Sequence, residues 1–216
     1  MRVLVIGATG TIGRAVVEAL AARHEVIVAS RSRAGLKVDL TQSDTIRAMF
    51  KATGPVDAVV CAAGEARFAS LAKLSDDDFR FSLTNKLMGQ VNLVRIGFEH
   101  VRDRGSLTVT SGVLARTPMS GSAAISLVNA GLEGFVRAAA LEAPRGIRVN
   151  AVSPPWVTDT LKALGMDPAQ GHPPAAVARL YVRSVEGADT GAVLEMPDPS
   201  ARSDQPPARP ADRSAK

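Results

Sequence analysis

A glycine triplet near the N-terminus has the residue types and spacing of a phosphate-binding turn. Gly7, Gly10 and Gly13 lie in GATGTIG, between an apolar segment at 2–6 and a segment of helical periodicity that starts at residue 11. Small residues let the backbone approach a phosphate, and free N–H groups at a helix N-terminus favour an anion. The spacing departs from the common G-x-G-x-x-G pattern, but its place directly after a first strand predicts a dinucleotide site.

Two arginines follow the next apolar segment, in ASRSR at 29–33. An Asp or Glu at the end of this strand would accept hydrogen bonds from the adenosine ribose of NAD, whereas a 2′-phosphate calls for a guanidinium group. No acid stands here, and Arg31 and Ser32 are the expected 2′-phosphate contacts. The sequence therefore favours NADP(H) over NAD(H).

The rest of the chain alternates apolar runs with segments of helical periodicity. Strands are expected at 2–6, 25–30, 57–62, 106–110, 147–152 and 190–196, and helices at 11–23, 43–52, 76–101, 123–142 and 173–185, with Gly105 as a helix stop. This order is typical of repeated β-α units around a parallel sheet. It predicts a single α/β domain over residues 1–196, a doubly wound parallel sheet of the Rossmann type with helices on both faces.

Composition narrows the possible functions. The chain has 216 residues and a net charge of +5, but its Lys and Arg residues are dispersed, which argues against a nucleic-acid partner. One Cys and three His residues give no disulfide framework and no metal-ligand spacing. No apolar run reaches the roughly 18 residues of a membrane helix, so a soluble, cytoplasmic protein is expected. The Pro-rich, mixed-charge segment 197–216 is expected to be a disordered tail.

Several further motifs, in order along residues 1–196, resemble those of the short-chain dehydrogenase/reductase family. They are VDL at 38–40, CAAG at 61–64, GSLTVTSG at 105–112 and RGIRVNAVSPPWV at 145–157. The resemblance implies hydride transfer between NAD(P)(H) and a carbonyl or alcohol, and a homodimer or homotetramer. The cofactor contacts that the motifs imply are Gly7, Thr9, Gly10, Thr11, Ile12, Gly13, Arg31, Ser32, Asp39, Leu40, Ala62, Ala63, Gly64, Pro154 and Val157.

The family's catalytic helix is the place where this chain departs from the resemblance. The family uses a Tyr as general acid or base and a Lys four residues later, but Ile125 occupies the Tyr position here and Asn129 the Lys position. The one Tyr of the chain is Tyr181, and the residue four later is Val185. Ser111 matches the family's Ser, although a spacing one residue shorter would select Gly112. An Asn at 129 could bind the nicotinamide ribose without lowering the pKa of a neighbour.

Another group must then exchange the proton, and Lys86 is the main candidate. It falls in the slot of the family's Asn, with Asn85 one residue early, and a desolvated Lys can act as acid or base. The alternatives for Lys86 are a side chain that extends from its helix into solvent and one that pairs with Asp76–Asp78. His172, in a loop expected to cover the cleft, is a weaker candidate, and water is another.

Three functions stay open on the sequence alone. The first is an NADP(H)-dependent oxidoreductase of a small carbonyl or alcohol with a non-standard proton donor. The second is a catalytically silent NADP(H)-binding protein that acts as a sensor or through a partner. The third is a lyase or isomerase on the same scaffold.

Overall fold

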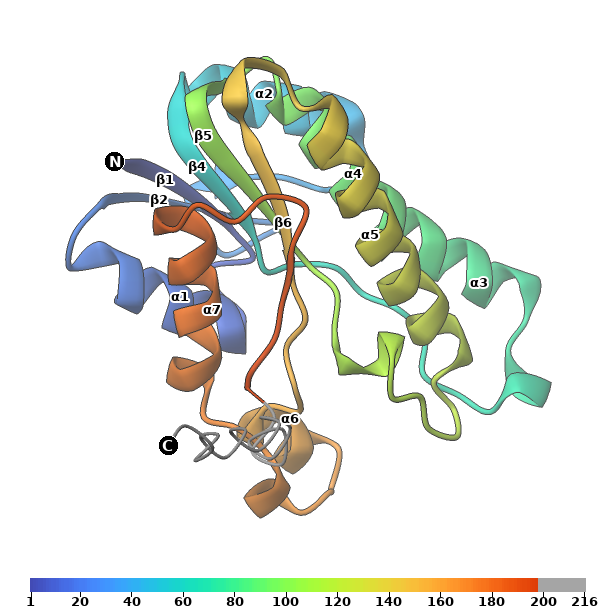
Figure 1. Cartoon of the computed structure of the whole chain (residues 1–216). Helices are drawn as coiled ribbons and strands as arrows, with labels where there is room; N and C mark the ends of the chain where they lie inside the picture. Colours follow the sequence, from blue (N-terminus) through green and yellow to red (C-terminus); the bar gives the residue numbers. More distant parts are fainter. Residues whose placement is uncertain (198–216) are drawn as a thin grey trace, which may run out of the picture.

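Seven parallel strands form one sheet at the centre of the protein (Figure 1), in the order β3-β2-β1-β4-β5-β6-β7. The computed structural model describes residues 1–197, so the predicted tail lies outside the described residues except for Pro197. The strands are β1 (Arg2–Ile6), β2 (Glu25–Ser30), β3 (Leu36–Lys37), β4 (Val56–Cys61), β5 (Val101–Thr110), β6 (Arg148–Val152) and β7 (Val193–Leu194). The predicted fold class is confirmed.

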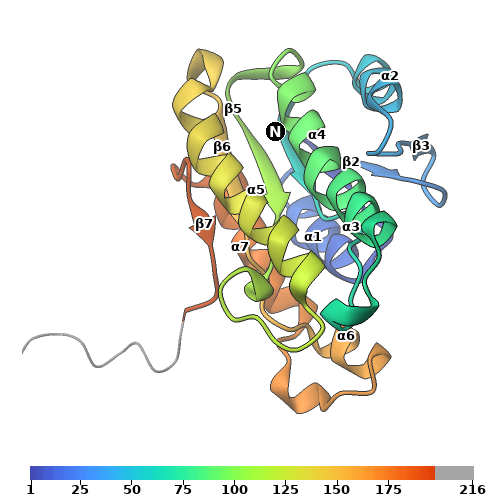
Figure 2. The same cartoon turned by 90° about the vertical axis from the view of Figure 1, so that its right-hand side faces the viewer.

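Helices cover both faces of this sheet (Figure 2). One layer holds α1 (Thr11–Ala21) and α7 (Pro174–Glu186), and the other holds α2 (Ser43–Thr53), α4 (Gly89–Gly97) and α5 (Ala123–Glu142). In β1, Val3 and Val5 point into the first layer, while Leu4 and Ile6 point into the second. Both faces are therefore buried, which explains why the central strands read as continuous apolar runs.

The long helix predicted over 76–101 is in fact three segments. After α3 (Asp76–Ser82), which begins at a capping box between Ser75 and Asp78, the chain passes through a π-helical turn, η2 (Leu83–Met88), into α4. The Gly89 N–H donates to the Thr84 carbonyl, five residues back, as a π-turn requires. The helix then ends at Gly97 instead of continuing to residue 101.

The start of β5 was predicted at residue 106 but lies at Val101, which pairs with Val56 of β4. The predicted helix stop at Gly105 is also wrong, because this glycine lies inside the strand. A Cβ atom there would clash with the carbonyl oxygen of Asp57. The residue before it, Arg104, has a φ of 61°. The pairing register also shifts between Val56 and Ala58. The first part of β5 is therefore irregular, and local sequence patterns do not reveal it.

Three smaller differences concern short elements. The two-residue strand β3 and the helix α6 (Thr158–Ala163) were not expected, and the strand predicted over 190–196 is limited to Val193–Leu194. Helix α5 has the predicted bounds. Contrary to expectation, it has the length and composition of a membrane span, a test that core helices of soluble proteins also pass, and it packs on β6.

Candidate active site

Two adjoining cavities lie where the parallel strands end. One is bounded by the glycine turn and the ends of β2 and β4, and the other by the ends of β5 and β6 and by α5. Ala62, Ala63 and Gly64, which follow β4, line both cavities. We call them the nucleotide cavity and the reaction cavity. Their shared wall is the predicted CAAG turn, so a single elongated ligand can extend from one into the other.

The glycine turn forms one side of the nucleotide cavity. Gly7 has a φ of 80°, a conformation that favours glycine, and a Cβ atom on Gly13 would clash with the Gly7 carbonyl. Gly10 is the N-cap of α1, and the first N–H groups of the helix have no acceptor within it. Gly7, Thr9 and Gly10 line this cavity and Ile12 lines the reaction cavity, whereas Thr11 and Gly13 line neither.

The opposite side of the nucleotide cavity carries the predicted arginine. Arg31 and Ser32 both line it, and an Arg31 guanidinium nitrogen lies 3.4 Å from a carboxylate oxygen of Glu65. The Ser30 hydroxyl accepts hydrogen bonds from the backbone N–H groups of Arg33 and Ala34, at 2.9 and 2.8 Å, which fixes the turn that presents these side chains. The guanidinium group therefore faces an open cavity.

Two further predicted cofactor contacts lie in this cavity. Asp39 and Leu40 line it, and the Asp39 carboxylate accepts hydrogen bonds from the backbone and hydroxyl of Thr41, at 3.0 and 2.8 Å. Sequence reasoning did not name four further lining residues, Ile6, Ser30, Val38 and Glu65, and it considered Asn85 only as an alternative to Lys86. The sequence signal of these four residues is their place at or just after the end of a strand.

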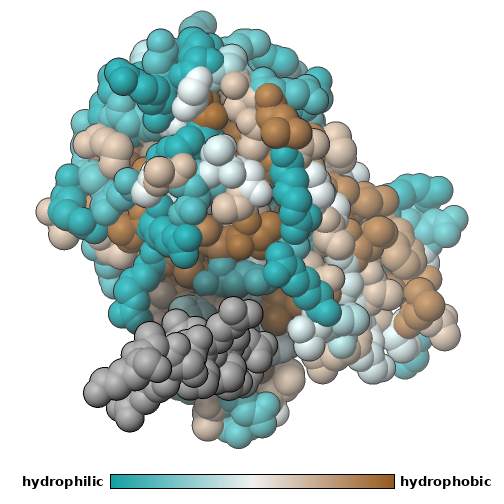
Figure 3. All heavy atoms as spheres, in the orientation of Figure 1, coloured by the Kyte–Doolittle hydropathy of each residue, from teal (hydrophilic) through white to brown (hydrophobic). Residues whose placement is uncertain are grey.

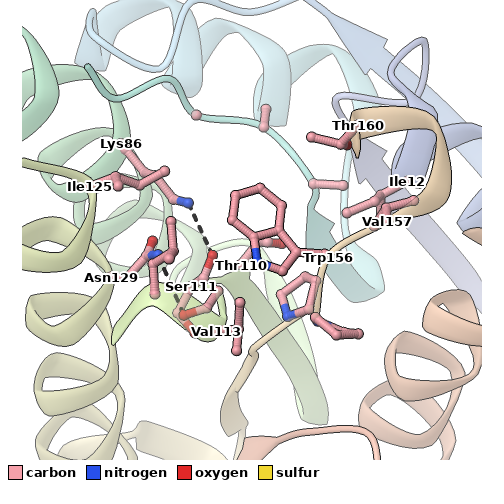
Figure 4. Close-up of a pocket in the computed structure, with 17 residues that line it drawn as sticks. Ile12, Lys86, Thr110, Ser111, Val113, Ile125, Asn129, Trp156, Val157 and Thr160 are labelled. Atoms are coloured by element: carbon pink, nitrogen blue, oxygen red, sulfur yellow. Dashed lines mark hydrogen bonds between the residues drawn. The ribbon is translucent and has the colours of Figure 1, made fainter. Parts of the chain in front are cut away.

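The reaction cavity, of about 320 Å³, brings together all three predicted catalytic residues. Lys86 comes from η2, Ser111 follows β5 and Asn129 comes from α5, and their side chains meet at one side of the cavity (Figure 4). Ile125 lies one turn before Asn129 and lines the same cavity. Pro154 and Val157, from the segment after β6, line the opposite side.

Lys86 is buried, and its Nζ atom donates a hydrogen bond to the carbonyl oxygen of Ser111 at 3.0 Å. Burial lowers the pKa of Lys86 to about 8, and the nearby Cys61 opposes this shift. Burial likewise raises the pKa of Cys61 to about 12, so this neighbour stays a neutral thiol near pH 7. A Lys that loses and regains its proton near neutrality can act as acid or base.

Both alternatives for Lys86 are wrong, because its side chain is buried and the carboxylates of Asp76–Asp78 have other partners. Asp76 and Asp77 contact Arg80, and Asp78 is held by Ser75 and Arg67. The choice between Lys86 and Asn85 is also resolved by position, because Asn85 lines the nucleotide cavity and Lys86 the reaction cavity.

Ser111 and Asn129 use part of their hydrogen-bonding capacity within the protein. The Ser111 hydroxyl donates toward a carboxylate oxygen of Glu133 at 3.3 Å, and the Asn129 amide nitrogen donates to the Gly112 carbonyl at 3.4 Å. The Asn129 amide oxygen is buried and has no protein partner among the described residues. A buried acceptor without a partner costs free energy, which a bound donor would recover.

Two other titratable side chains, one of them the candidate His172, lie outside the reaction cavity. Tyr181 is fully buried in the α7 layer, shares a 2.8 Å hydrogen bond with the Thr110 hydroxyl, and has its pKa raised by burial. His172 was expected over the cleft, but it lines neither cavity and instead pairs through its backbone with Val157. Neither side chain is placed to exchange a proton in the reaction cavity.

Sequence reasoning missed two prominent side chains of this region. Trp156, the single Trp of the chain, lies within the reaction cavity (Figure 4), and only its aromatic character in the SPPWV motif could have indicated it. Glu133 is buried behind Ser111, and its signal was the four-residue spacing from Asn129, which places both on one face of α5.

Comparisons with known proteins agree with this arrangement. Residues 4–191 match a family model described as enoyl-(acyl carrier protein) reductase. The chain is 29% identical over 194 residues to the 3-oxoacyl-[acyl-carrier-protein] reductase FabG of Salmonella typhimurium, a match that covers 78% of each protein.

Solved structures show the same similarity. The crystal structure of lin1944 from Listeria innocua is 38% identical, with a TM-score of 0.87 over 91% of this chain and 99% of that one. A small-chain dehydrogenase in complex with NADPH is 24% identical, with a TM-score of 0.80 over 91% and 96% of the two chains, a likeness that concerns the fold alone. The matched length, the nucleotide-binding sheet and the motifs around both cavities show that the chain belongs to the short-chain dehydrogenase/reductase family of oxidoreductases.

Proposed function

We propose that the protein transfers a hydride between NADP(H) and a small alcohol or carbonyl compound, with Lys86 exchanging the proton. The observation that carries this proposal is the place of the Lys86 amine. It is buried in the reaction cavity, has a pKa near 8, and uses one hydrogen bond within the protein. An ammonium group has three donor hydrogens, so others are free for a substrate oxygen.

The residues around the nucleotide cavity fit a phosphorylated dinucleotide. The first turn of α1 offers free N–H groups to a diphosphate, and the exposed Arg31 and Ser32 suit a 2′-phosphate. The unpartnered Asn129 oxygen suits a ribose hydroxyl at the other end. When bound, the nicotinamide ring would supply the hydride donor or acceptor. The chain's own residues would orient it and move the proton.

Lys86 would serve both directions of such a reaction. As an ammonium group it donates a proton to the oxygen of a carbonyl compound while the hydride arrives at carbon. As a neutral amine it accepts the proton of an alcohol. A pKa near the working pH suits both tasks, and a positioned acid or base contributes about 10²- to 10⁴-fold to the rate.

A second candidate function, a silent NADP(H)-binding protein, is favoured by one observation. Ile125 lines the reaction cavity at the position where the family resemblance expects a Tyr, and the chain's single Tyr is buried elsewhere. Under this second function, the protein would bind the cofactor without catalysing a reaction.

A thermal-shift titration with NADP⁺, NADPH, NAD⁺ and NADH tests both functions. We expect the phosphorylated cofactors to raise the melting temperature at lower concentrations than NAD(H). No shift with any of the four would contradict both candidates. Steady-state assays with panels of alcohols and carbonyl compounds then separate them, because a bound cofactor without turnover favours the silent protein.

A homodimer or homotetramer stays a prediction. Apolar side chains gather on the side of the molecule that carries α3 to α5 (Figure 3), where Met88, Leu127 and Leu141 are exposed. Gly131 of α5 packs against Leu87, whereas Gly134 faces open space. Packing within the subunit therefore explains only some of the small residues of this helix. Gel filtration with light scattering would measure the assembly.

A further inference from the structure

A buried carboxylate lies behind the reaction cavity, and the proton exchange at Lys86 does not use it. Glu133 of α5 is 4% exposed, and two guanidinium groups compensate its charge. Arg116 Nε lies 3.3 Å and an Arg137 nitrogen 3.5 Å from its Oε2 atom. Arg116 also contacts Glu195, which lies closer to the surface. The other carboxylate oxygen, Oε1, is left to face Ser111.

The hydrogen of Ser111 is committed to the protein. Its hydroxyl has two neighbours within hydrogen-bond distance, Glu133 Oε1 at 3.3 Å and the Val152 carbonyl at 3.4 Å. Both are acceptors, and a carboxylate can only accept. No donor from the described residues contacts this hydroxyl oxygen. Ser111 therefore donates its one hydrogen within the protein, and its lone pairs remain available to accept a hydrogen bond from a ligand.

The polar groups that face the reaction cavity thus follow a pattern. Ser111 offers an acceptor, and so does the unpartnered Asn129 amide oxygen. Lys86 offers the charged donor. A carbonyl oxygen placed against Ser111 would meet another oxygen with no hydrogen between them. A hydroxyl group in the same place would donate to Ser111.

We propose that Glu133 is a positioning residue that holds the Ser111 hydrogen, and that the cavity therefore prefers an alcohol to the corresponding carbonyl compound. This inference rests on the proposed function, because it names the substrate class of the same cavity. In the reaction it implies, NADP⁺ is the oxidant. The C–H bond of the alcohol breaks and its electron pair leaves as hydride for the nicotinamide ring. The hydroxyl hydrogen, which is directed to Ser111 in the bound alcohol, turns to the neutral Lys86 amine and passes to it as a proton while the C=O bond forms.

The test measures binding of two ring compounds of similar size, cyclohexanol and cyclohexanone, to the protein without cofactor, so that neither reacts. Trp156 in the cavity wall reports binding by fluorescence, and saturation-transfer NMR gives an independent measurement. We expect wild type to bind the alcohol about tenfold more tightly, which corresponds to about 1.4 kcal/mol, because the ketone would leave a buried polar group mispaired. Equal binding, preference for the ketone, or binding of neither compound would overturn the proposal.

Glu133→Gln identifies the role of the carboxylate. The Gln amide can donate to Ser111, which frees the Ser111 hydrogen for a carbonyl oxygen. The alcohol-to-ketone preference should therefore fall by about tenfold or reverse. Glu142→Gln removes the same charge from an exposed position of α5 and should leave the preference unchanged. A Glu133→Gln variant that folds and keeps the wild-type ratio contradicts the proposal.

Ser111→Ala keeps the test decisive if Glu133→Gln does not fold. Without the hydroxyl, the two compounds should bind within about twofold of each other. An alcohol preference that survives Ser111→Ala would exclude Ser111 and Glu133 as its source. Failure of the proposed function is detected separately, because NADP(H) titrations do not depend on either ring compound.

Discussion

The nucleotide cavity and the reaction cavity share the Ala62–Gly64 wall but differ in how they are built. The first consists mainly of backbone turns, such as the one at Gly7, and of exposed charged side chains, such as that of Arg31. The second consists of buried side chains, among them Lys86, Ser111 and Asn129, each held by specific neighbours. The first cavity can therefore be read from local sequence patterns, whereas the second depends on packing between distant elements. We therefore expect cofactor binding and chemistry to respond to different substitutions.

The largest expected effect separates the two cavities directly. Lys86→Met should lower turnover by about 10²- to 10⁴-fold, because it removes the proton-exchanging group. The dissociation constant of NADPH should change by less than about threefold, since Lys86 does not line the nucleotide cavity. Steady-state kinetics and fluorescence titration measure the two quantities. Lys51→Met, on the exposed face of α2, is the matched control. Unchanged turnover in Lys86→Met would remove Lys86 from the mechanism.

Arg31→Ala is the converse substitution, in the nucleotide cavity. Loss of a charge-assisted hydrogen bond to the 2′-phosphate should weaken NADPH binding by about 10- to 100-fold and NADH binding much less. Calorimetry with both cofactors measures the difference. Arg47→Ala, at an exposed position of α2, controls for the change in net charge. An equal loss for NADPH and NADH would contradict the assignment of the 2′-phosphate to Arg31.

The buried amine also predicts how stability depends on pH. Its pKa is about 8 in the folded protein and near 10.5 in the unfolded chain, so the unfolded state binds more protons between these values. Stability attributable to Lys86 should therefore rise with pH in this window, by about 2 kcal/mol between pH 7 and 9.5. Urea unfolding of wild type and Lys86→Met at both pH values isolates this contribution, because both proteins keep Cys61. Parallel pH profiles would contradict it.

The smallest effect concerns the direction of the reaction. Carbonyl reduction requires the Lys86 ammonium group and should fall about tenfold between pH 7 and pH 9, while alcohol oxidation should rise by a similar factor. Initial rates in both directions measure this. NADPH binding should change little over the same range, because Lys86 does not line the nucleotide cavity. A pH profile that follows cofactor binding would instead locate the titrating group in the nucleotide cavity.

The sequence allowed the sheet, the glycine turn and the arginine turn to be predicted, because each depends on neighbours in the chain. Gly105 was misassigned, since its reason is the carbonyl of Asp57 on another strand. The contact of Glu133 with Ser111 spans 22 residues and exists only because α5 packs beside β5 and β6. Lys86, Ser111 and Asn129 could be named as candidates, but their convergence required the fold.

The π-helical turn η2 has an evolutionary consequence. Each residue of an α-helix is rotated by about 100° from the previous one, and a π-turn accommodates one extra residue without disturbing the helices on either side. Asn85 and Lys86 consequently face different cavities. Deletion of one residue between Leu83 and Met88 could convert the turn to α-helix and present another side chain to the reaction cavity. A change in chain length at this point would then act as an active-site substitution. Related proteins could in this way come to differ in their chemistry through a rotation of the residues in this turn, while the core stays intact.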